Sequence, residues 1–263
     1  MNLTDIRYRK EGGVAIATLN RPEVLNAFRD TTYDDFDSIL EDVTLDDKIS
    51  VLILTGEEWA FSAGEDLNEL GNRLDETDVD AYPRARIERI QDFTRKMVAM
   101  PKIIIAVLNG PAVGIGAELA VAADIRIACD ACYFYFPEVK LGLFETNGVT
   151  YFLPRLIGAG RAMELFLTGK RLPAERALEW GLVTRVAPQE ALMEEAMATA
   201  ETILSHSSTS VRLLKQAVHQ SLGAELENML SFETDALLEC IRAGETGDNV
   251  KAFLEKRTKG KSE

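Results

Sequence analysis

Apolar residues occur in short, nearly continuous runs along the first half of the chain. Val14–Leu19, Val51–Thr55 and Ile103–Leu108 are such runs, and their length and content are typical of buried β-strands. Between the first two, Thr31–Val43 follows a helical period instead, which predicts an amphipathic helix. Its apolar face consists of Tyr33, Phe36, Ile39, Leu40 and Val43. Alternation of strands and helices predicts an α/β core with a parallel sheet.

The pattern changes further along the chain. Residues 72–92 are polar and charged, so we expect a mobile segment there that enters a helix ending before Pro101. Shorter elements are expected next, with strands at Asp124–Cys129 and Tyr133–Phe136 and helices at Arg161–Gly169 and Pro173–Gly181. After Glu190 the pattern is helical, with breaks near Ser205–Ser208, Gly223 and Gly244–Gly247. We therefore expect an α/β core over residues 1–190 and a helical region over residues 191–263.

Composition narrows the class of protein. The chain has 263 residues, of which 46% are hydrophobic and 27% charged, as in one large globular domain or a core with a small appendage. No apolar run approaches the roughly 20 residues that span a bilayer, and the opening MNLTDIRYRKEGG lacks the apolar core of a secretory signal, so a cytoplasmic protein is expected. A net charge of −14 would repel a duplex or an anionic membrane, so neither nucleic acid nor a membrane is an expected partner.

Two local features could bind ligands but also have simpler structural interpretations. Five basic residues near the end of the chain either form the solvated end of a helix or contact phosphate groups of a ligand. They are Lys251, Lys256, Arg257, Lys259 and Lys261. Cys129 and Cys132 have C-x-x-C spacing, but there is no second pair, and the only histidines, His206 and His219, are far along the chain. Ordinary packing is therefore favoured over a metal or redox site.

Carboxylates and backbone N–H groups are the remaining candidates for chemistry. The chain has neither a G-x-S-x-G elbow nor a G-x-x-x-x-G-K-[ST] loop. Asn109–Leu119 is a glycine-rich turn between a predicted strand and a predicted helix, where N–H groups at the helix start can bind an anion. Glu118, inside this turn, and Glu138 are candidate acids or bases. Each also has a structural interpretation, as an acid near a helix start or an acid in a loop.

Several separate segments together carry a resemblance to a known family. They are Asn20-Arg21-Pro22 with Asn26-Ala27, Phe61–Leu67, Asn109–Leu119, Phe136-Pro137-Glu138 with Leu141-Gly142, and Leu167–Gly169 with Gly181-Leu182-Val183. In these segments, and in their order, the chain resembles the crotonase superfamily, which comprises enoyl-CoA hydratases and isomerases. The resemblance implies the crotonase (ClpP/crotonase-like) fold, an α/β fold with a repeated ββα spiral core and an α-helical C-terminal trimerisation region.

The resemblance also implies a site and a reaction. The substrate would be an acyl-CoA thioester whose enolate oxygen accepts hydrogen bonds from the backbone N–H groups of Glu65 and Ile115. Glu118 and Glu138 would hold a water, one accepting its proton and the other supplying the α-proton. The positions carried over as substrate or CoA contacts are Val24, Leu25, Ala63, Gly64, Asp66 and Leu67. No metal and no cofactor apart from the CoA of the substrate are implied, and the expected assembly is a homotrimer or a dimer of trimers.

One segment departs from the family's usual pattern. Leu143–Thr150 replaces a loop rich in proline and glycine, and it contains a third acid, Glu145. This acid either faces solvent or caps a following helix, or it is a pocket acid that alters the substrate or the reaction. Relatives that act as dienoyl isomerases carry an additional acid one position later, where this chain has Thr146.

The expected function is hydration of the 2,3-double bond of an enoyl-CoA. Two alternatives stay open at this point. One is a Δ3-Δ2 enoyl-CoA isomerase that uses Glu138 alone, or other enolate chemistry on a CoA thioester such as hydrolysis or decarboxylation. The other is a non-catalytic scaffold that binds CoA or RNA.

Overall fold

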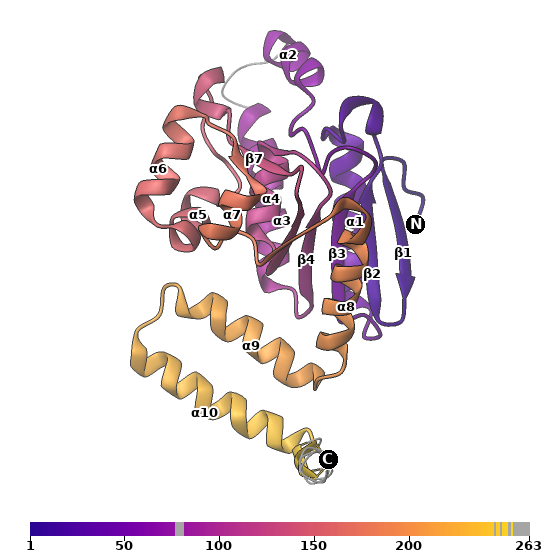
Figure 1. Ribbon diagram of the computed structural model, residues 1–263, viewed down its shortest axis with the longest axis vertical. Coiled ribbons are helices and arrows are strands. Elements are labelled where there is room, and N and C mark those ends of the chain that lie inside the picture. The colour runs from indigo at the N-terminus through magenta and orange to yellow at the C-terminus, as the bar shows by residue number, and fades with distance from the viewer. Residues whose placement is uncertain (77–81, 245, 248, 252–253, 255–263) are drawn as a thin grey trace. The chain divides into compact units, whose positions relative to one another are not determined.

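The computed structural model describes residues 1–76, 82–244, 246–247, 249–251 and 254, and within them the apolar runs build a six-stranded sheet in the order β1-β2-β3-β4-β6-β9 (Figure 1). Its strands are β1 Ile6–Glu11, β2 Val14–Leu19, β3 Val51–Gly56, β4 Ile103–Leu108, β6 Ile125–Cys129 and β9 Arg185–Ala187. Only β1 is antiparallel to its neighbour among these strands. Every residue of β3 is buried, as expected for a central strand covered on both faces. The predicted α/β core with parallel strands is confirmed.

A smaller sheet of three short strands completes the core of the described chain. The strands are β5 Ala112–Val113, β7 Tyr133–Tyr135 and β8 Leu172–Pro173. β4, β5 and α4 (Ile115–Ala122) form one strand–strand–helix unit, and β6, β7 and α5 (Val149–Ile157) form another. Two isolated parallel bridges connect earlier segments of the chain to this smaller sheet. Ser62 pairs with Ala112 of β5, and Phe28 pairs with Glu65. The core is thus a repeated ββα spiral, as the resemblance implied.

The first compact unit, Met1–Glu201, contains the remaining helices of the core. They are α1 Asp30–Leu45, α2 Leu67–Glu76, α3 Tyr82–Ala99, α6 Ala159–Thr168, α7 Ala174–Glu179 and the larger part of α8 Leu192–Leu204. Short 3-10 helices lie at Pro22–Val24, Glu138–Leu141 and Gln189–Ala191. α1 packs against β1, β2 and α3, and its predicted apolar face is buried.

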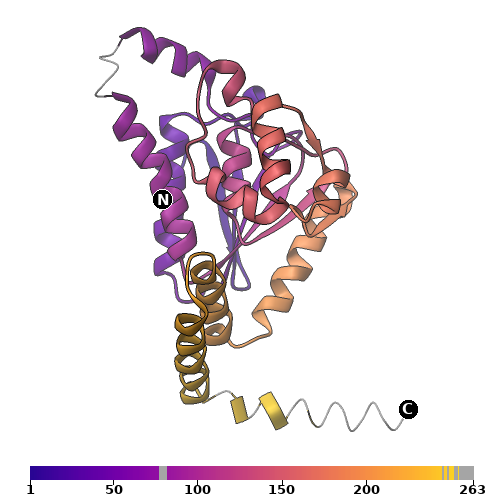
Figure 2. The same cartoon turned by 90° about the vertical axis from the view of Figure 1, so that its left-hand side faces the viewer.

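The segment predicted to be mobile is helical in its described part. α2 continues to Glu76 and α3 begins at Tyr82, whereas residues 77–81 lie outside the described residues. α2 stands away from the strands in both views (Figures 1 and 2). The prediction missed the early start of α3 because most of its residues are polar. Ile90, Phe93 and Met97 nevertheless recur at helical spacing and are buried.

The second compact unit, Thr202–Glu263, is helical in its described part. α9 (Ser208–Ser221) packs against α10 (Leu226–Arg242), as Figure 2 shows, which confirms the predicted helical pattern after Glu190. Its role in subunit packing stays a prediction. Of the predicted basic cluster, Lys251 is described, whereas Lys256, Arg257, Lys259 and Lys261 lie outside the described residues. No described helix combines the length and the apolar character needed to cross a membrane.

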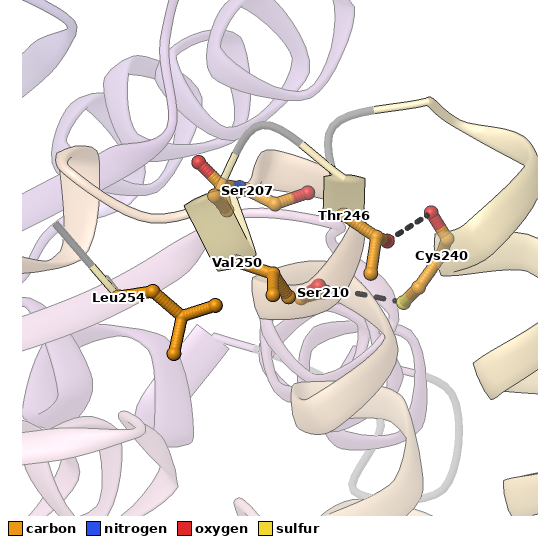
Figure 3. A pocket seen from close by; sticks show the side chains of 7 residues that line it. Ser207, Ser210, Cys240, Thr246, Val250 and Leu254 are labelled. Atoms are coloured by element: carbon orange, nitrogen blue, oxygen red, sulfur yellow. Dashed lines mark hydrogen bonds between the residues drawn. The ribbon is translucent and has the colours of Figure 1, made fainter. Parts of the chain in front are cut away.

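A pocket of about 330 Å³ lies within this second unit (Figure 3). Its lining consists of Ser207, Ser210, Cys240, Thr246, Asn249, Val250 and Leu254. Ser210 Oγ lies 3.4 Å from Cys240 Sγ, and Thr246 Oγ1 donates to Cys240 O at 3.2 Å. Among the described residues its lining carries no acidic or basic side chain, whereas the candidate acids Glu118 and Glu138 belong to the first unit.

The C-x-x-C pair has a packing role. Cys129 ends β6 and Cys132 lies in the following turn, and both thiols are free and buried. Burial raises the pKa of both, and raises that of Cys132 well above its ordinary value. Thiols held in this neutral form behave as small apolar side chains, as predicted.

Candidate active site

The two glycine-rich loops of the sequence lie side by side. The first loop, Phe61–Leu67, follows β3, and the second loop, Asn109–Leu119, follows β4, its parallel neighbour. Ser62 forms a parallel bridge with Ala112, and the Val113 N–H donates to Ser62 O at 2.9 Å. Glu65 and Ile115 each come three residues after the bridged residue of their own loop. The structure therefore brings the two predicted hydrogen-bond donors to the same place.

Glycine is required where the loops touch. Gly64 has φ +91°, and a Cβ there would lie 2.9 Å from Val113 O. Gly114 has φ +50°, and a Cβ there would lie 3.0 Å from Glu138 Oε1. Both positions combine a left-handed backbone with a close approach, so a side chain would strain the backbone and separate the groups around it.

The second donor sits at the start of a buried helix. Ile115 is the first residue of α4, and every residue of α4 is buried. Gly114 N donates to Tyr135 O, and Glu118 N donates to Gly114 O, both at 2.9 Å. The Ile115 N–H donates to no protein acceptor among the described residues. An N–H group in the first turn of a helix has no partner within the helix, and it is suited to bind an anion.

The first donor belongs to a loop that is held from both sides. Phe28 N donates to Gly64 O at 2.7 Å, and Asp66 N donates to Phe28 O at 2.9 Å. Because amides alternate in direction along an extended segment, the Glu65 N–H is directed away from Phe28. Ala63 N also donates to Leu25 O at 2.8 Å. The backbone of the first loop is thereby fixed around the predicted donor.

Charged side chains fix the first loop as well. Tyr33 of α1 donates its hydroxyl to Glu65 Oε2, and Arg86 of α3 pairs with Glu65 Oε1 and with Asp30. The Arg86 guanidinium lies 4.9 Å from the centroid of the Tyr33 ring. Burial and the charge of Glu65 raise the pKa of Tyr33 well above its ordinary value, so this hydroxyl remains a donor. Sequence reasoning missed both Tyr33 and Arg86 as neighbours of this donor.

A cavity of about 440 Å³ opens beside the two loops. The residues that line it come from the two loops, α2, α3 and the segment around Glu138. They are Ala63, Gly64, Glu65, Leu67, Leu70, Arg86, Ile87, Ile90, Val113, Gly114, Ile115, Glu118, Tyr135, Pro137, Glu138, Leu141, Leu143, Phe144 and Thr146. A largely apolar cavity with a few convergent polar groups is typical of a small-molecule site.

The predicted CoA contacts are only partly at this cavity. Ala63, Gly64 and Leu67 line it, whereas Val24 and Leu25 do not. Asp66 is buried outside the lining, where its Oδ2 lies 3.1 Å from the Arg21 guanidinium. Arg21 also donates to Ala27 O at 2.7 Å, so it links Asp66 of the first loop to the segment that contains Ala27. The CoA-binding role of all six residues remains a prediction.

Both predicted acids line the cavity, and they differ in their hydrogen bonds. Glu118 is only 1% exposed, and Thr146 donates its N–H to Oε1 at 3.0 Å and its hydroxyl to Oε2 at 3.3 Å. Glu138 begins the 3-10 helix Glu138–Leu141, and its Oε2 is buried with no hydrogen-bond partner among the described residues. The segment Leu143–Thr150, which departs from the family's pattern, therefore supplies Thr146 as the hydrogen-bond donor to Glu118. The sequence did not predict this role.

Glu145 joins these two acids. One carboxyl oxygen each from Glu118, Glu138 and Glu145 lies within 4.8 Å of the others, and Glu145 Oε2 is buried. Glu145 is half-buried beside the two acids, and its role as a pocket acid stays a prediction. Glu145 does not itself line the cavity, because Glu118 and Glu138 lie at the cavity wall.

Burial sets the proton affinity of this cluster. It raises the pKa of Glu118, although the hydrogen bonds from Thr146 oppose this, and it raises the pKa of Glu138 together with the charge of Glu118. Burial, followed by the charges of Glu138 and Glu118, raises the pKa of Glu145 to about 10. The three carboxyls could offer oxygens to a cation, but protons compete for the same oxygens. The expected absence of a metal stays a prediction.

Comparisons with known proteins agree with this geometry. The family described as enoyl-CoA hydratase/isomerase matches residues 9–261. The chain is 36% identical to a short-chain-enoyl-CoA hydratase of Clostridium acetobutylicum over 98% of this chain and 97% of that protein. It is 37% identical to a 1,2-epoxyphenylacetyl-CoA isomerase of Escherichia coli over 94% of each. The crystal structure of an enoyl-CoA hydratase from Bacillus anthracis is similar with a TM-score of 0.90 and 33% identity, covering 96% of this chain and 97% of that one.

Proposed function

The chain belongs to the enoyl-CoA hydratase/isomerase family of the crotonase superfamily, and from this premise we propose that it hydrates the 2,3-double bond of an enoyl-CoA thioester. The proposal rests on one observation: backbone amide donors and carboxyl groups lie at the same cavity. The loops that present the Glu65 and Ile115 amides form one side, and Glu118 and Glu138 lie beside them. Amide donors suit a developing enolate oxygen, and paired carboxyls suit the addition of water.

The proposed reaction uses each group once. Water oxygen bonds to the β-carbon while one carboxylate takes a proton from that water. The electrons of the double bond move onto the thioester oxygen, where the Glu65 and Ile115 N–H groups stabilise the enolate. The enolate then collapses as the second carboxyl delivers a proton to the α-carbon. The product is a 3-hydroxyacyl-CoA, and no redox cofactor takes part in the proposed steps.

The hydrogen bonds favour one assignment of the two acids. Thr146 donates to both oxygens of Glu118, which stabilises the ionised form and suits the base that accepts the proton of water. The charge of Glu118 adds to the effect of burial in raising the pKa of Glu138, which suits the acid that donates to the α-carbon. Two neighbouring carboxyls with unequal surroundings divide the roles of acid and base in this way.

The proposal is tested by an assay of crotonyl-CoA hydration, in which the loss of the enoyl thioester absorbance is measured over time. Glu138→Gln should lower kcat by about 10²–10⁴-fold with folding intact, because the amide cannot donate and recover a proton. Glu175→Gln, at an exposed position of α7, is the matched control and should retain wild-type activity. Full activity in Glu138→Gln would overturn the assignment.

Isomerisation of an acyl-CoA is the second candidate function. The 37% identity to the 1,2-epoxyphenylacetyl-CoA isomerase favours it. Moving a proton between two carbons needs principally one base, and Glu138 could serve alone. Glu118→Ala therefore separates the two functions, since hydration should collapse whereas isomerisation should largely survive. Product identification by mass and chromatography distinguishes the 3-hydroxyacyl product from the shifted double bond.

Assembly and location complete the proposal. We propose a homotrimer or a dimer of trimers in the cytoplasm. The helical region after residue 190 is the part that would pack between subunits, and α10 carries several exposed leucines, as such an interface requires. Three free cysteines suit a reducing compartment. Sedimentation equilibrium of the purified protein tests the assembly.

A further inference from the structure

The third acid of the site needs an explanation that neither the loops nor the paired acids supply. Three carboxyl oxygens within 4.8 Å cannot all carry a negative charge in a buried place, because each charge would be poorly solvated and would repel the other two. Glu138 Oε2 and Glu145 Oε2 are both buried, and neither finds a donor among the described protein groups. Buried carboxyl oxygens this close together coexist when a proton lies among them.

The surroundings show which carboxyl holds that proton. Glu118 already accepts two hydrogen bonds from Thr146, which favour its ionised form. Glu138 lines the cavity, whereas Glu145 does not. Burial raises the pKa of Glu145 to about 10, and the charges of Glu138 and Glu118 add to this effect. Glu145 is therefore the carboxyl behind the pair that keeps a proton.

The loop that carries Glu145 is anchored by neutral groups. Gln91 of α3 donates to Thr146 O at 3.2 Å, and Thr94 of α3 donates to Asn147 O at 3.0 Å. The ionisable groups that act on Glu145 are Glu118 of α4 and Glu138 of the 3-10 helix. Both of these groups are acids, and their negative charges disfavour a third negative charge at this position.

We propose that Glu145 is a positioning residue, which holds a proton behind Glu118 and Glu138 and donates its single O–H hydrogen bond to the ionised Glu118. It does not touch the substrate. Its neutral carboxyl fixes the orientation of Glu118 and keeps the charge of that base available for the addition of water. The role rests on the proposed function, in which Glu118 is the base and Glu138 is the acid.

The test compares Glu145→Gln, which keeps a neutral donor, with Glu145→Ala, which removes it. The readout is kcat/KM for crotonyl-CoA from about pH 6 to about pH 10.5. In Glu145→Ala the acid limb should move up by about one pH unit, with about a tenfold loss at the lowest pH, because the base loses a bond that stabilises its charged form. Glu145→Gln should keep the acid limb near its wild-type position, because the amide still donates a hydrogen bond to Glu118. Uniform loss at every pH in both variants, or wild-type profiles in both, would overturn the proposal.

A second measurement does not depend on activity. The infrared difference spectrum between wild type and Glu145→Gln at about pH 8 should contain the carbonyl band of a protonated carboxylic acid, because the pKa of Glu145 is raised to about 10. Absence of that band would overturn the proposal even if Glu145→Ala failed to fold. If crotonyl-CoA is not hydrated at all, the proposed function fails, and the infrared band still decides where the proton lies.

Discussion

The two loops that present the backbone donors do the same task by different physical means. The second loop runs into α4, whose residues are all buried, and its donor Ile115 is 6% exposed. The first loop places a carboxylate, Glu65, at the donor position and ties it to Arg86 and Tyr33. One donor is positioned by apolar packing, and the other is positioned by an ion pair and a hydrogen bond.

The difference shows what each loop depends on. A donor held by packing is sensitive to volume, because interiors are close-packed and relax only partly. A donor held by an ion pair is sensitive to the loss of either partner, because the other charge is left without compensation. The elements involved also differ, since Arg86 comes from α3, which follows the undescribed residues 77–81, whereas α4 lies within the core. Substitutions can therefore disturb one donor and spare the other.

Gly64→Ala should have the largest effect, because it breaks the contact that both loops share. The new Cβ would lie 2.9 Å from Val113 O at a residue with φ +91°. The loops must then separate, and both donors move. We expect kcat to fall by about 10²–10³-fold, the usual result of losing an oxyanion donor. Crotonyl-CoA hydration measures this effect.

The matched control for this substitution is Gly181→Ala. Gly181 has φ +79° and nothing within 4 Å of an added Cβ, and it does not line the cavity. It carries the same backbone strain, about 1–2 kcal/mol, without the clash. Equal losses of activity in the two variants would show that the contact between the loops does not position the donors.

Arg86→Met should disturb the first loop alone. It removes the cation paired with Glu65 while the second loop keeps its packing. We expect the free energy of unfolding to fall by about 2 kcal/mol, because the Arg86 and Glu65 side chains are mostly buried, and kcat/KM to fall by about tenfold. Urea denaturation and steady-state kinetics check the two effects.

Arg84→Met is the control on the same helix, because Arg84 is 81% exposed and its described ion pair with Glu88 lies at the surface. The double variant Glu65→Gln/Arg86→Met should regain part of the lost stability, since no charge is left without its partner. Wild-type stability in Arg86→Met would mean that the ion pair contributes nothing to the loop.

The sequence predicted the loops themselves, and the packing of the second loop, better than the ion pair that holds the first loop. Apolar runs predicted β3 and β4, and the glycine-rich segments predicted the loops that follow them. The partners of Glu65 could not be predicted, because Tyr33 is 32 positions and Arg86 21 positions away and their approach depends on how α1 and α3 pack. The hydrogen bonds from Thr146 to Glu118 could not be predicted for the same reason, because the two residues are 28 positions apart.

Other misses have local causes. β5 and β8 have two residues each, which is too short for any period to be visible. β1 is an edge strand that is mostly exposed, so its sequence IRYRKE lacks an apolar run. The proximity of Glu145 to Glu118 and Glu138 stayed open at the sequence level because it depends on the path of one irregular loop.

Raising the pH should lower the contribution of the Glu118, Glu138 and Glu145 cluster to the free energy of unfolding. It should not change the contribution of the Arg86–Glu65 ion pair. The pKa values of Glu118, Glu138 and Glu145 are raised in the folded state, so the folded protein binds more protons than the unfolded one above about pH 5. Stability is therefore lost as the pH rises. We expect the free energy of unfolding to fall by about 1–2 kcal/mol between about pH 5 and pH 9, a figure reduced for partial exposure to solvent.

Urea denaturation at several pH values measures this slope in three proteins. Glu145→Gln should flatten it, whereas Arg86→Met should lower stability equally at every pH. Working above pH 5 avoids the titration of Asp5, Asp42 and Asp46, whose pKa values are lowered. An unchanged slope in Glu145→Gln would place the cause of the pH dependence in groups other than Glu145.

Ile115→Val should have the smallest effect, because it changes the packed donor without touching its N–H. The substitution removes one methylene from a buried side chain that lines the cavity, at about 0.5–1.5 kcal/mol of stability. Activity on crotonyl-CoA should stay within about threefold, and the preference for an acyl chain one carbon longer should rise a few-fold because the cavity is wider.

Glu65→Ala also keeps its N–H but removes the acceptor of Tyr33 and Arg86, so it should lower activity more. Kinetics of both variants across a series of enoyl-CoA lengths test this ranking. If Ile115→Val lost as much activity as Glu65→Ala, the side chains would not differ in how they position the two donors.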